Sequence, residues 1–116
     1  MSVSQACNSL YNDKVWKNYT HKVGSQNIDI SSLTYTELYI IIVKSSDYKC
    51  MSLYIPKTAL PSNGDYRYCV LGGYWSDTNA YGGYIDISRS SIKLLSFAYG
   101  STDYLNTAKL FLYYRN

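Results

Sequence analysis

The stretch LYIIIV, residues Leu38–Val43, is the longest apolar run in this chain of 116 residues. It has the length of a strand and is far shorter than the roughly 18 apolar residues that a membrane-spanning helix requires. Its β-branched and aromatic side chains suit a pleated sheet. Because nearly every position is apolar, the sequence predicts that residues 37–43 form a central strand covered on both faces.

The segments on either side of this run alternate between apolar and polar residues, as strands with one buried face do. In the next segment Met51, Leu53 and Ile55 share one face, and Pro56 ends the strand because proline cannot donate a hydrogen bond to a ladder. Further strands are predicted over 16–21, 26–30, 66–75, 81–88, 91–99 and 107–115. Turn signals about every 8–12 residues are typical of an all-β sandwich or barrel. We therefore expect an all-β fold: a single small antiparallel β-sandwich, jelly-roll-like, of about seven or eight strands.

The first residues follow a different pattern. Apolar residues recur at helical spacing from Val3 to Leu10, and Ser2 can cap the start of a helix. A helix of this length is not stable alone in water, so the segment is either the end of a stalk helix or an ordered tail. We expect two parts, a short N-terminal helical or extended segment over 1–15 and a head domain over 16–116.

The connections between strands carry signals of their own. The pair Asn63-Gly64 can supply the positive φ values of a tight turn. The segment 56–61 resists a strand interpretation, so a single helical turn is expected there. Residues 77–80 and 100–103 are predicted as turns between the last strands.

Composition narrows the classes of protein further. The chain has 15 Tyr, 47% hydrophobic residues and 16% charged residues, which excludes a disordered chain of low hydrophobicity and high net charge. Its net charge of +3 comes from Lys and Arg residues that are nowhere adjacent, whereas a nucleic-acid partner requires a clustered basic patch. We therefore predict neither a nucleic-acid partner nor membrane insertion.

The cysteines and the N-terminus bear on the cell compartment. Cys7, Cys50 and Cys69 match no metal-binding or redox spacing, and unpaired cysteines point to folding in a reducing cytoplasm. Cys50 and Cys69 lie in strand-like segments, so we expect two small buried hydrophobes, with a disulfide between them as an open alternative. The N-terminus lacks the charged and apolar regions of a signal peptide. No metal and no cofactor are predicted.

Catalytic arrangements find little support in the sequence. Hydrolysis of a glycosidic bond usually needs two facing carboxyl groups, and only Asp29, Glu37 and Asp86 fall within predicted strands. Asp86 is the strongest candidate, although an exposed strand residue is its expected role. His21 is the only histidine and has no nucleophile motif near it, so we expect a solvated surface histidine. We predict that the protein is not an enzyme and has no catalytic residues.

The stretch Leu71–Ile85 is the strongest candidate for a binding site. It holds two Gly-Gly-Tyr units around a polar Ser-Asp-Thr-Asn turn. If the flanking strands pair as a hairpin, the glycines leave a shallow depression rimmed by aromatic rings, whose faces suit sugar rings. The predicted ligand-binding residues are Tyr74, Trp75, Asp77, Asn79, Tyr81 and Tyr84. The alternative is structural: the glycines accommodate a bulge, and the tyrosines pack across strands.

The order of the segments resembles the small C-terminal head domains of phage and prophage tail-fibre or baseplate proteins. The resemblance covers residues 16–116, from Trp16-Lys17 through the Leu38–Val43 strand and Ser90–Leu94 to the closing strand Leu110–Arg115, which ends in aromatic-Tyr-Arg. It implies a trimeric β-sandwich tip that binds bacterial surface carbohydrate. It implies no particular set of binding residues.

Three functions are compatible with the sequence. The first is a non-enzymatic receptor-binding domain of a phage tail that recognises a bacterial cell-surface glycan, as a homotrimer located in the virion and made in the bacterial cytoplasm. The second is a structural module of a phage particle whose exposed tyrosines serve self-assembly. The third is a small glycan-active enzyme that uses Asp86 and Glu37. The scarcity of Glu and His favours a binding domain over the enzyme.

Overall fold

The computed structural model describes residues 2–44, 49–76, 79–99 and 102–116. One helix precedes a series of strands with two short 3-10 turns, η1 and η2. In chain order the elements are α1 (Val3–Lys14), β1 (Lys17–Val23), β2 (Asn27–Asp29), β3 (Glu37–Lys44), β4 (Lys49–Pro56), η1 (Lys57–Ala59), β5 (Tyr66–Ser76), β6 (Asn79–Ile87), β7 (Ser91–Tyr99), β8 (Thr102–Asp103), η2 (Leu105–Thr107) and β9 (Ala108–Arg115).

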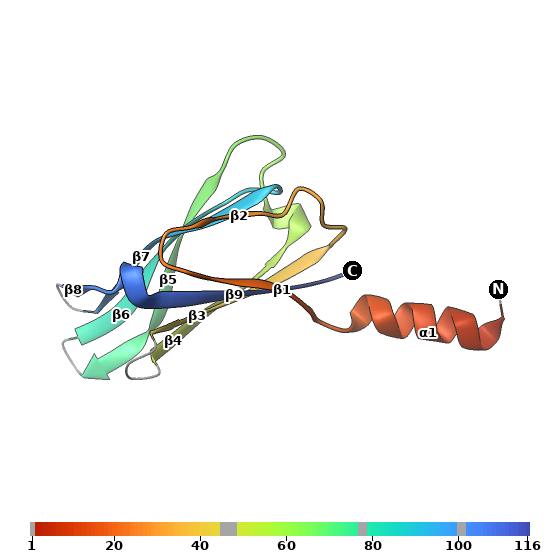
Figure 1. The fold of residues 1–116 in the computed structure, drawn as a ribbon, viewed down its shortest axis with the longest axis horizontal. Helices are drawn as coiled ribbons and strands as arrows, with labels where there is room; N and C mark the ends of the chain where they lie inside the picture. The colour runs from red at the N-terminus through yellow and green to blue at the C-terminus, as the bar shows by residue number, and fades with distance from the viewer. Residues whose placement is uncertain (1, 45–48, 77–78, 100–101) are drawn as a thin grey trace.

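The strands form two antiparallel sheets that pack face to face (Figure 1). One sheet has the order β1-β9-β3-β4, so its first two strands come from opposite ends of the chain. The other has the order β2-β7-β6-β5, with β8 paired to β7. This arrangement confirms the predicted all-β antiparallel sandwich. The described residues contain nine strands, because β8 forms a two-residue strand where the sequence predicts a turn over 100–103.

Strand β3 lies between β9 and β4, as expected for a central strand. Along it, burial alternates without interruption: Leu38, Ile40 and Ile42 are buried between the sheets, while Tyr39 and Ile41 are only half-buried on the outer face. The prediction that both faces of this strand are covered is therefore wrong for the outer face. The sandwich covers one side of the sheet and leaves an unusually apolar surface on the other.

The core lies between the two sheets and draws on both of them. The largest fully buried side chains are Phe97, Ile30, Leu38, Ile40, Ile42, Met51, Ile85, Ile87, Ile92, Leu94, Leu110 and Leu112. Burying one such side chain stabilises a fold by about 1.5–3 kcal/mol. A register slip of one residue would turn a whole row of them outward, so the core fixes the register of β3, β4, β6, β7 and β9.

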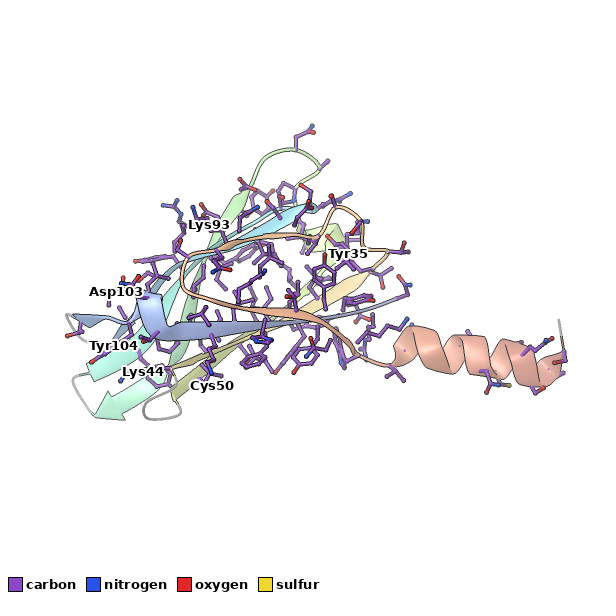
Figure 2. The ribbon with its side chains drawn as sticks, in the orientation of Figure 1. Tyr35, Lys44, Cys50, Lys93, Asp103 and Tyr104 are labelled. Atoms are coloured by element: carbon purple, nitrogen blue, oxygen red, sulfur yellow. The ribbon has the colours of Figure 1, made fainter. Side chains whose placement is uncertain are left out.

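Tyr35, labelled in Figure 2, belongs to this core although it carries a polar group. It is buried, and its hydroxyl donates to the main-chain oxygen of Arg89 at 2.8 Å. Burial raises the pKa of the Tyr35 hydroxyl. The bond ties the loop before β3 to the turn between β6 and β7, which belongs to the other sheet.

Two of the turns predicted from the local sequence are present in the structure. The expected helical turn within 56–61 is present as η1, directly after Pro56 at the end of β4. Gly64 has a φ of +77°, the left-handed conformation that the Asn63-Gly64 pair predicts and that residues with a Cβ rarely adopt. Residues 77–78, within the predicted turn between β5 and β6, lie outside the described residues.

The expectation that Cys50 is a buried hydrophobe is wrong. Cys50, labelled in Figure 2, is exposed and free, so it forms no disulfide with Cys69. The reason is the alternation along β4: Met51 and Ile55 are buried in the core, which turns Cys50 to the outer face. The side chain of Cys69 lies outside the described residues.

Helix α1 extends away from the sandwich along the long axis of the molecule, whose extents are 57 × 30 × 22 Å (Figure 1). Its start is capped as predicted, because Ser2 Oγ accepts a hydrogen bond from the N–H of Gln5 at 3.1 Å and Gln5 Oε1 accepts one from the N–H of Ser2 at 2.8 Å. Val3 and Leu10 are 82% and 64% exposed, so the sandwich does not cover these apolar positions. Among the described residues, no helix is long and apolar enough to cross a membrane.

Candidate functional site

The outer face of the four-stranded sheet carries a shallow hollow of about 250 Å³, lined by Trp16, Tyr39, Ile41 and Tyr113. The strand register builds it, because Tyr39 is opposite Tyr113 on one side and opposite Tyr54 on the other. Side chains directly opposite each other lie about 4.5–5.5 Å apart at Cβ, so the three tyrosines form one row across the sheet. We call the surface of these five residues the aromatic face.

Trp16 lies between α1 and β1 and covers part of this row. Its ring centroid is 5.8 Å from that of Tyr39 and 6.3 Å from that of Tyr54, with the second pair edge-on at 87°. Both distances are within the range of favourable aromatic pairs. Trp16 is half-buried, so part of the indole is packed on the sheet and part lines the hollow.

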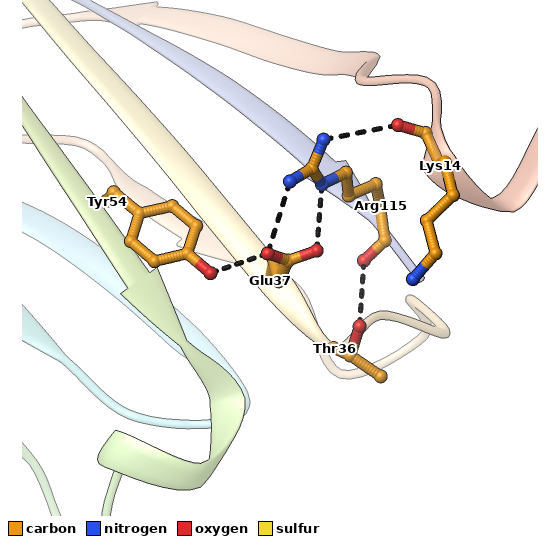
Figure 3. Close-up of polar contacts among 5 residues, drawn as sticks. All are labelled: Lys14, Thr36, Glu37, Tyr54 and Arg115. Carbon is orange, nitrogen blue, oxygen red and sulfur yellow. Dashed lines mark hydrogen bonds and ion pairs between the residues drawn. The ribbon is translucent and has the colours of Figure 1, made fainter.

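A charged cluster borders the aromatic face close to α1 (Figure 3). Arg115 Nε donates to Glu37 Oε2 at 2.7 Å and Arg115 Nη2 donates to Glu37 Oε1 at 3.3 Å, a two-point ion pair between β9 and β3. The Tyr54 hydroxyl donates to Glu37 Oε1 at 2.5 Å. The guanidinium carbon of Arg115 lies 4.3 Å from the Trp16 ring centroid, within cation–π range.

These contacts determine the charge of the cluster. Hydrogen bonds from Arg115, and next from Tyr54, hold the pKa of the Glu37 carboxyl below its usual value. The pKa of the Tyr54 hydroxyl is raised, chiefly because it donates to that carboxylate. At neutral pH the opposite charges of Glu37 and Arg115 therefore compensate each other. The exposed Lys14 at the end of α1 also acts on Glu37, so the border of the aromatic face is polar and has a small excess of positive charge.

Aromatic side chains continue along the sheet beyond the hollow. His21 on β1 and Phe111 on β9 are register partners, and their rings stack with centroids 5.6 Å apart and planes 28° apart. His21 is exposed, as the sequence predicts. Within the described ranges, no group of three or more His, Cys, Asp or Glu side chains could hold a metal ion.

The predicted binding hairpin is present, but the structure describes its site only in part. Strands β5 and β6 pair antiparallel around the predicted turn, at the end of the sandwich away from α1 (Figure 1). Asp77 lies outside the described residues, and so do the side chains of Tyr74, Trp75 and Asn79. Their role in binding stays a prediction.

The described part of the hairpin favours the structural alternative. Tyr81 is half-buried and packs against the core residue Phe97, with ring centroids 6.3 Å apart. At Gly83 there is no open depression, because a Cβ atom would lie 1.8 Å from the main-chain oxygen of Ser96. A bulge follows directly in the pairing of β6 with β7. Tyr84 is 47% exposed and is the one predicted site residue whose described side chain is largely open to solvent.

The two carboxylates considered for catalysis lie in different sheets. Glu37 is on β3, and Asp86 is on β6, where Arg67 Nε and Nη2 donate to its two oxygens at 2.8 and 3.2 Å. The hydrogen bond from Arg67 lowers the pKa of Asp86. Both carboxyl groups are held ionised, whereas a general acid in glycoside hydrolysis needs a raised pKa.

The sequence alone does not predict the aromatic face. Trp16, Tyr39 and Tyr113 come from distant segments that only the strand order β1-β9-β3 brings together. One signal could have indicated it: the outward positions of β3, such as Tyr39 and Ile41, are as apolar as its inward ones. Such a strand needs a second covering layer, and the described sandwich supplies only one.

Comparison with known proteins assigns no family to the chain. Protein-family models, curated proteins and solved structures all gave no match. The resemblance to tail-fibre head domains therefore stays a prediction. What the protein can bind has to follow from the geometry and charge of the aromatic face.

Proposed function

We propose that this protein is a non-enzymatic receptor-binding domain of a phage-type tail tip, which recognises bacterial surface carbohydrate through the aromatic face. One observation carries the proposal: a hollow of about 250 Å³ has aromatic rings on its walls and a compensated Glu37–Arg115 pair at its border. Half-exposed aromatic surface on a small domain marks an interaction site.

The walls and the border suit different parts of a sugar. The C–H face of a pyranose ring is apolar and can lie flat on Trp16 or Tyr113, while its hydroxyls can reach the oxygens of Glu37 and Tyr54. Tyr and Trp offer rigid contact area at a low cost in conformational entropy. Pockets for small molecules usually measure about 300–1,000 Å³, so this shallow hollow suits one sugar unit of a longer chain. A neutral glycan suits a border in which the charges of Glu37 and Arg115 compensate each other.

The charge state of the carboxylates supports binding rather than catalysis. Glu37 and Asp86 each form a two-point ion pair with an arginine, and hydrogen bonds from that arginine hold each pKa below its usual value. Neither is set up to donate a proton to a leaving group. Glu37 and Asp86 also lie on different sheets, so their carboxyl groups do not face one substrate.

The second candidate function, self-assembly, is favoured by α1. Val3, Cys7 and Leu10 follow one another at spacings of four and three residues, the pattern of a helix seam that packs against another helix. Helices of this length are marginal in water without a partner, and α1 projects into solvent (Figure 1). We propose that α1 associates with the same helix of other copies, with the homotrimer implied by the tail-fibre resemblance as the expected state. Glycan binding and this assembly are compatible.

A glycan array tests the proposed function. The probes are bacterial O-antigen and capsular polysaccharides together with neutral oligosaccharides, and binding of the wild-type chain is compared with that of Trp16→Ala. We expect the wild type to bind at least one neutral glycan and Trp16→Ala to lose most of that signal, because Trp16 forms one wall of the hollow.

Tyr66→Ala serves as the matched control. Tyr66 is an exposed aromatic residue of the other sheet, so its removal should leave the array signal unchanged. Absence of glycan binding by the wild type would overturn the proposal. Equal binding by wild type and Trp16→Ala would remove the aromatic face as the site.

A further inference from the structure

The side chain of Arg115 contacts Glu37, Lys14 and Trp16 where α1 meets the sheet, and Figure 3 shows the first two of these contacts. Besides the ion pair with Glu37, Arg115 Nη1 donates to the main-chain oxygen of Lys14 at 3.2 Å. Lys14 is the last residue of α1. The same guanidinium lies against the ring of Trp16. The main-chain oxygen of Arg115 accepts a hydrogen bond from the N–H of Thr36 at 3.0 Å, which anchors the end of β9 beside β3.

We infer that Arg115 is a positioning residue that couples α1 to the aromatic face: one guanidinium holds both the Trp16 ring at the wall of the hollow and the last turn of α1. The importance of Trp16 to a ligand rests on the proposed function. The coupling itself is a property of the free protein. It makes the orientation of the helix and the shape of the binding surface depend on one side chain.

Each contact uses a different feature of the guanidinium group. The last four carbonyl groups of a helix have no partner inside the helix, and a cation near them is favoured by the helix dipole, so the bond to Lys14 stabilises the end of α1. The planar fork forms the two-point pair with Glu37, which fixes the orientation of the plane. The flat face of that plane is then available to stack on Trp16.

The chain between the two anchored parts is very short. Only Val15 separates the last residue of α1 from Trp16, so a rotation of the helix about its end moves the indole directly. Conversely, a ligand that holds Trp16 in place also favours the anchored position of α1, because coupling between two sites is reciprocal. Glycan binding at the aromatic face would thereby stabilise the anchored position of α1, the helix that we propose joins the chains.

The test uses the free chain of 116 residues with Trp75→Phe, which leaves Trp16 as its only tryptophan. In this background Arg115→Met removes the fork and the charge, and Arg115→Lys keeps the charge but not the fork. The readouts are acrylamide quenching of Trp16 fluorescence and hydrogen exchange of the amides in residues 3–14. We expect Arg115→Met to raise the quenching constant about twofold and to speed exchange in the last turn of α1 about 2- to 5-fold. Arg115→Lys should fall between the parent and Arg115→Met.

Arg67→Met is the matched control, because Arg67 and Asp86 form the same kind of cross-strand ion pair on the other sheet. It should change neither readout. Unchanged quenching or unchanged exchange in Arg115→Met overturns the inference, and so does an equal change in Arg67→Met. If Arg115→Met does not fold, the same criteria apply to Arg115→Lys. Because no ligand is present, failure of the glycan array and failure of this test are independent results.

Discussion

Gly83 on β6 and Ser96 on β7 approach so closely that a Cβ atom at position 83 would lie 1.8 Å from the main-chain oxygen of Ser96. The contact occurs beside a bulge, since Tyr84 is opposite Ser96 whereas Ile85 is opposite Leu94. Bulges increase the local twist of a strand and bring its backbone out of the regular ladder. Close packing of the two strands therefore explains why position 83 is a glycine, independently of any ligand.

We expect Gly83→Ala to lower the free energy of unfolding by about 2–4 kcal/mol, because main-chain atoms of β7 would have to move. Gly64→Ala is the control. Gly64 has a φ of +77° but nothing within 4 Å of the added Cβ, so only the cost of positive φ applies, about 1 kcal/mol. Chemical denaturation followed by circular dichroism measures both, and equal losses would contradict the proposed close contact.

The Glu37 carboxyl should make the free energy of unfolding depend on pH in the acidic range. Its pKa is lowered in the folded protein by Arg115 and Tyr54, so the resulting stabilisation is complete above the unfolded-state pKa of about 4.3. It is lost as the pH falls through the lower folded-state pKa, because below the unfolded-state pKa the unfolded chain binds a proton at Glu37 more readily than the folded protein does.

We expect Glu37→Gln to lose less stability than the wild type when urea unfolding is repeated at decreasing pH. Asp86→Asn should show a similar change, because Arg67 lowers the pKa of Asp86 in the same way. A pH profile of Glu37→Gln with the same slope as that of the wild type would contradict the ion-pair geometry.

Cys50 should react with a thiol reagent in the native protein, because it is exposed and free. We expect Cys50→Ser to remove one rapidly reacting thiol in a spectrophotometric assay. The change should not alter the free energy of unfolding by more than about 0.5 kcal/mol. If Cys50→Ser leaves the number of rapidly reacting thiols unchanged, Cys50 does not lie on the outer face.

Self-association through α1 can be measured by sedimentation. We expect the wild type to form a homotrimer at micromolar concentration and Leu10→Lys to sediment as a monomer, because a charge in a helix seam is costly to bury. Val23→Lys, at an exposed apolar position of β1, should remain a trimer. A monomeric wild type would refute the proposed assembly, whatever the variants do.

Much of the fold follows from local pattern. The prediction of a strand over 91–99 coincides with β7, and Met51 and Ile55, predicted to share one face of their strand, are both buried in the core. Each of these segments has one face that must be buried, so period and face are determined by its own residues. The cap at Ser2 has the same local origin.

The features that the sequence analysis did not predict share a different cause. Strand β8 exists only because Thr102 and Asp103 pair with β7, and nothing in two residues specifies that partner. The aromatic face requires the strand order and register, which bring Trp16 beside Tyr39 and Tyr39 opposite Tyr113. Local pattern shows that β3 is too apolar for one covering layer, but it does not show what lies on the other side.

Binding at the aromatic face is tested most directly by one titration series with two variants. Trp16→Ala removes a wall of the hollow, and Tyr74→Ala/Trp75→Ala removes two rings of the predicted hairpin site. Both are titrated calorimetrically with the glycan that gives the strongest array signal. We expect Trp16→Ala to weaken binding about 30-fold, equivalent to about 2 kcal/mol, and the double variant to stay within about twofold of the wild type. Loss of binding in the double variant, with Trp16→Ala unaffected, would contradict the aromatic face as the binding site.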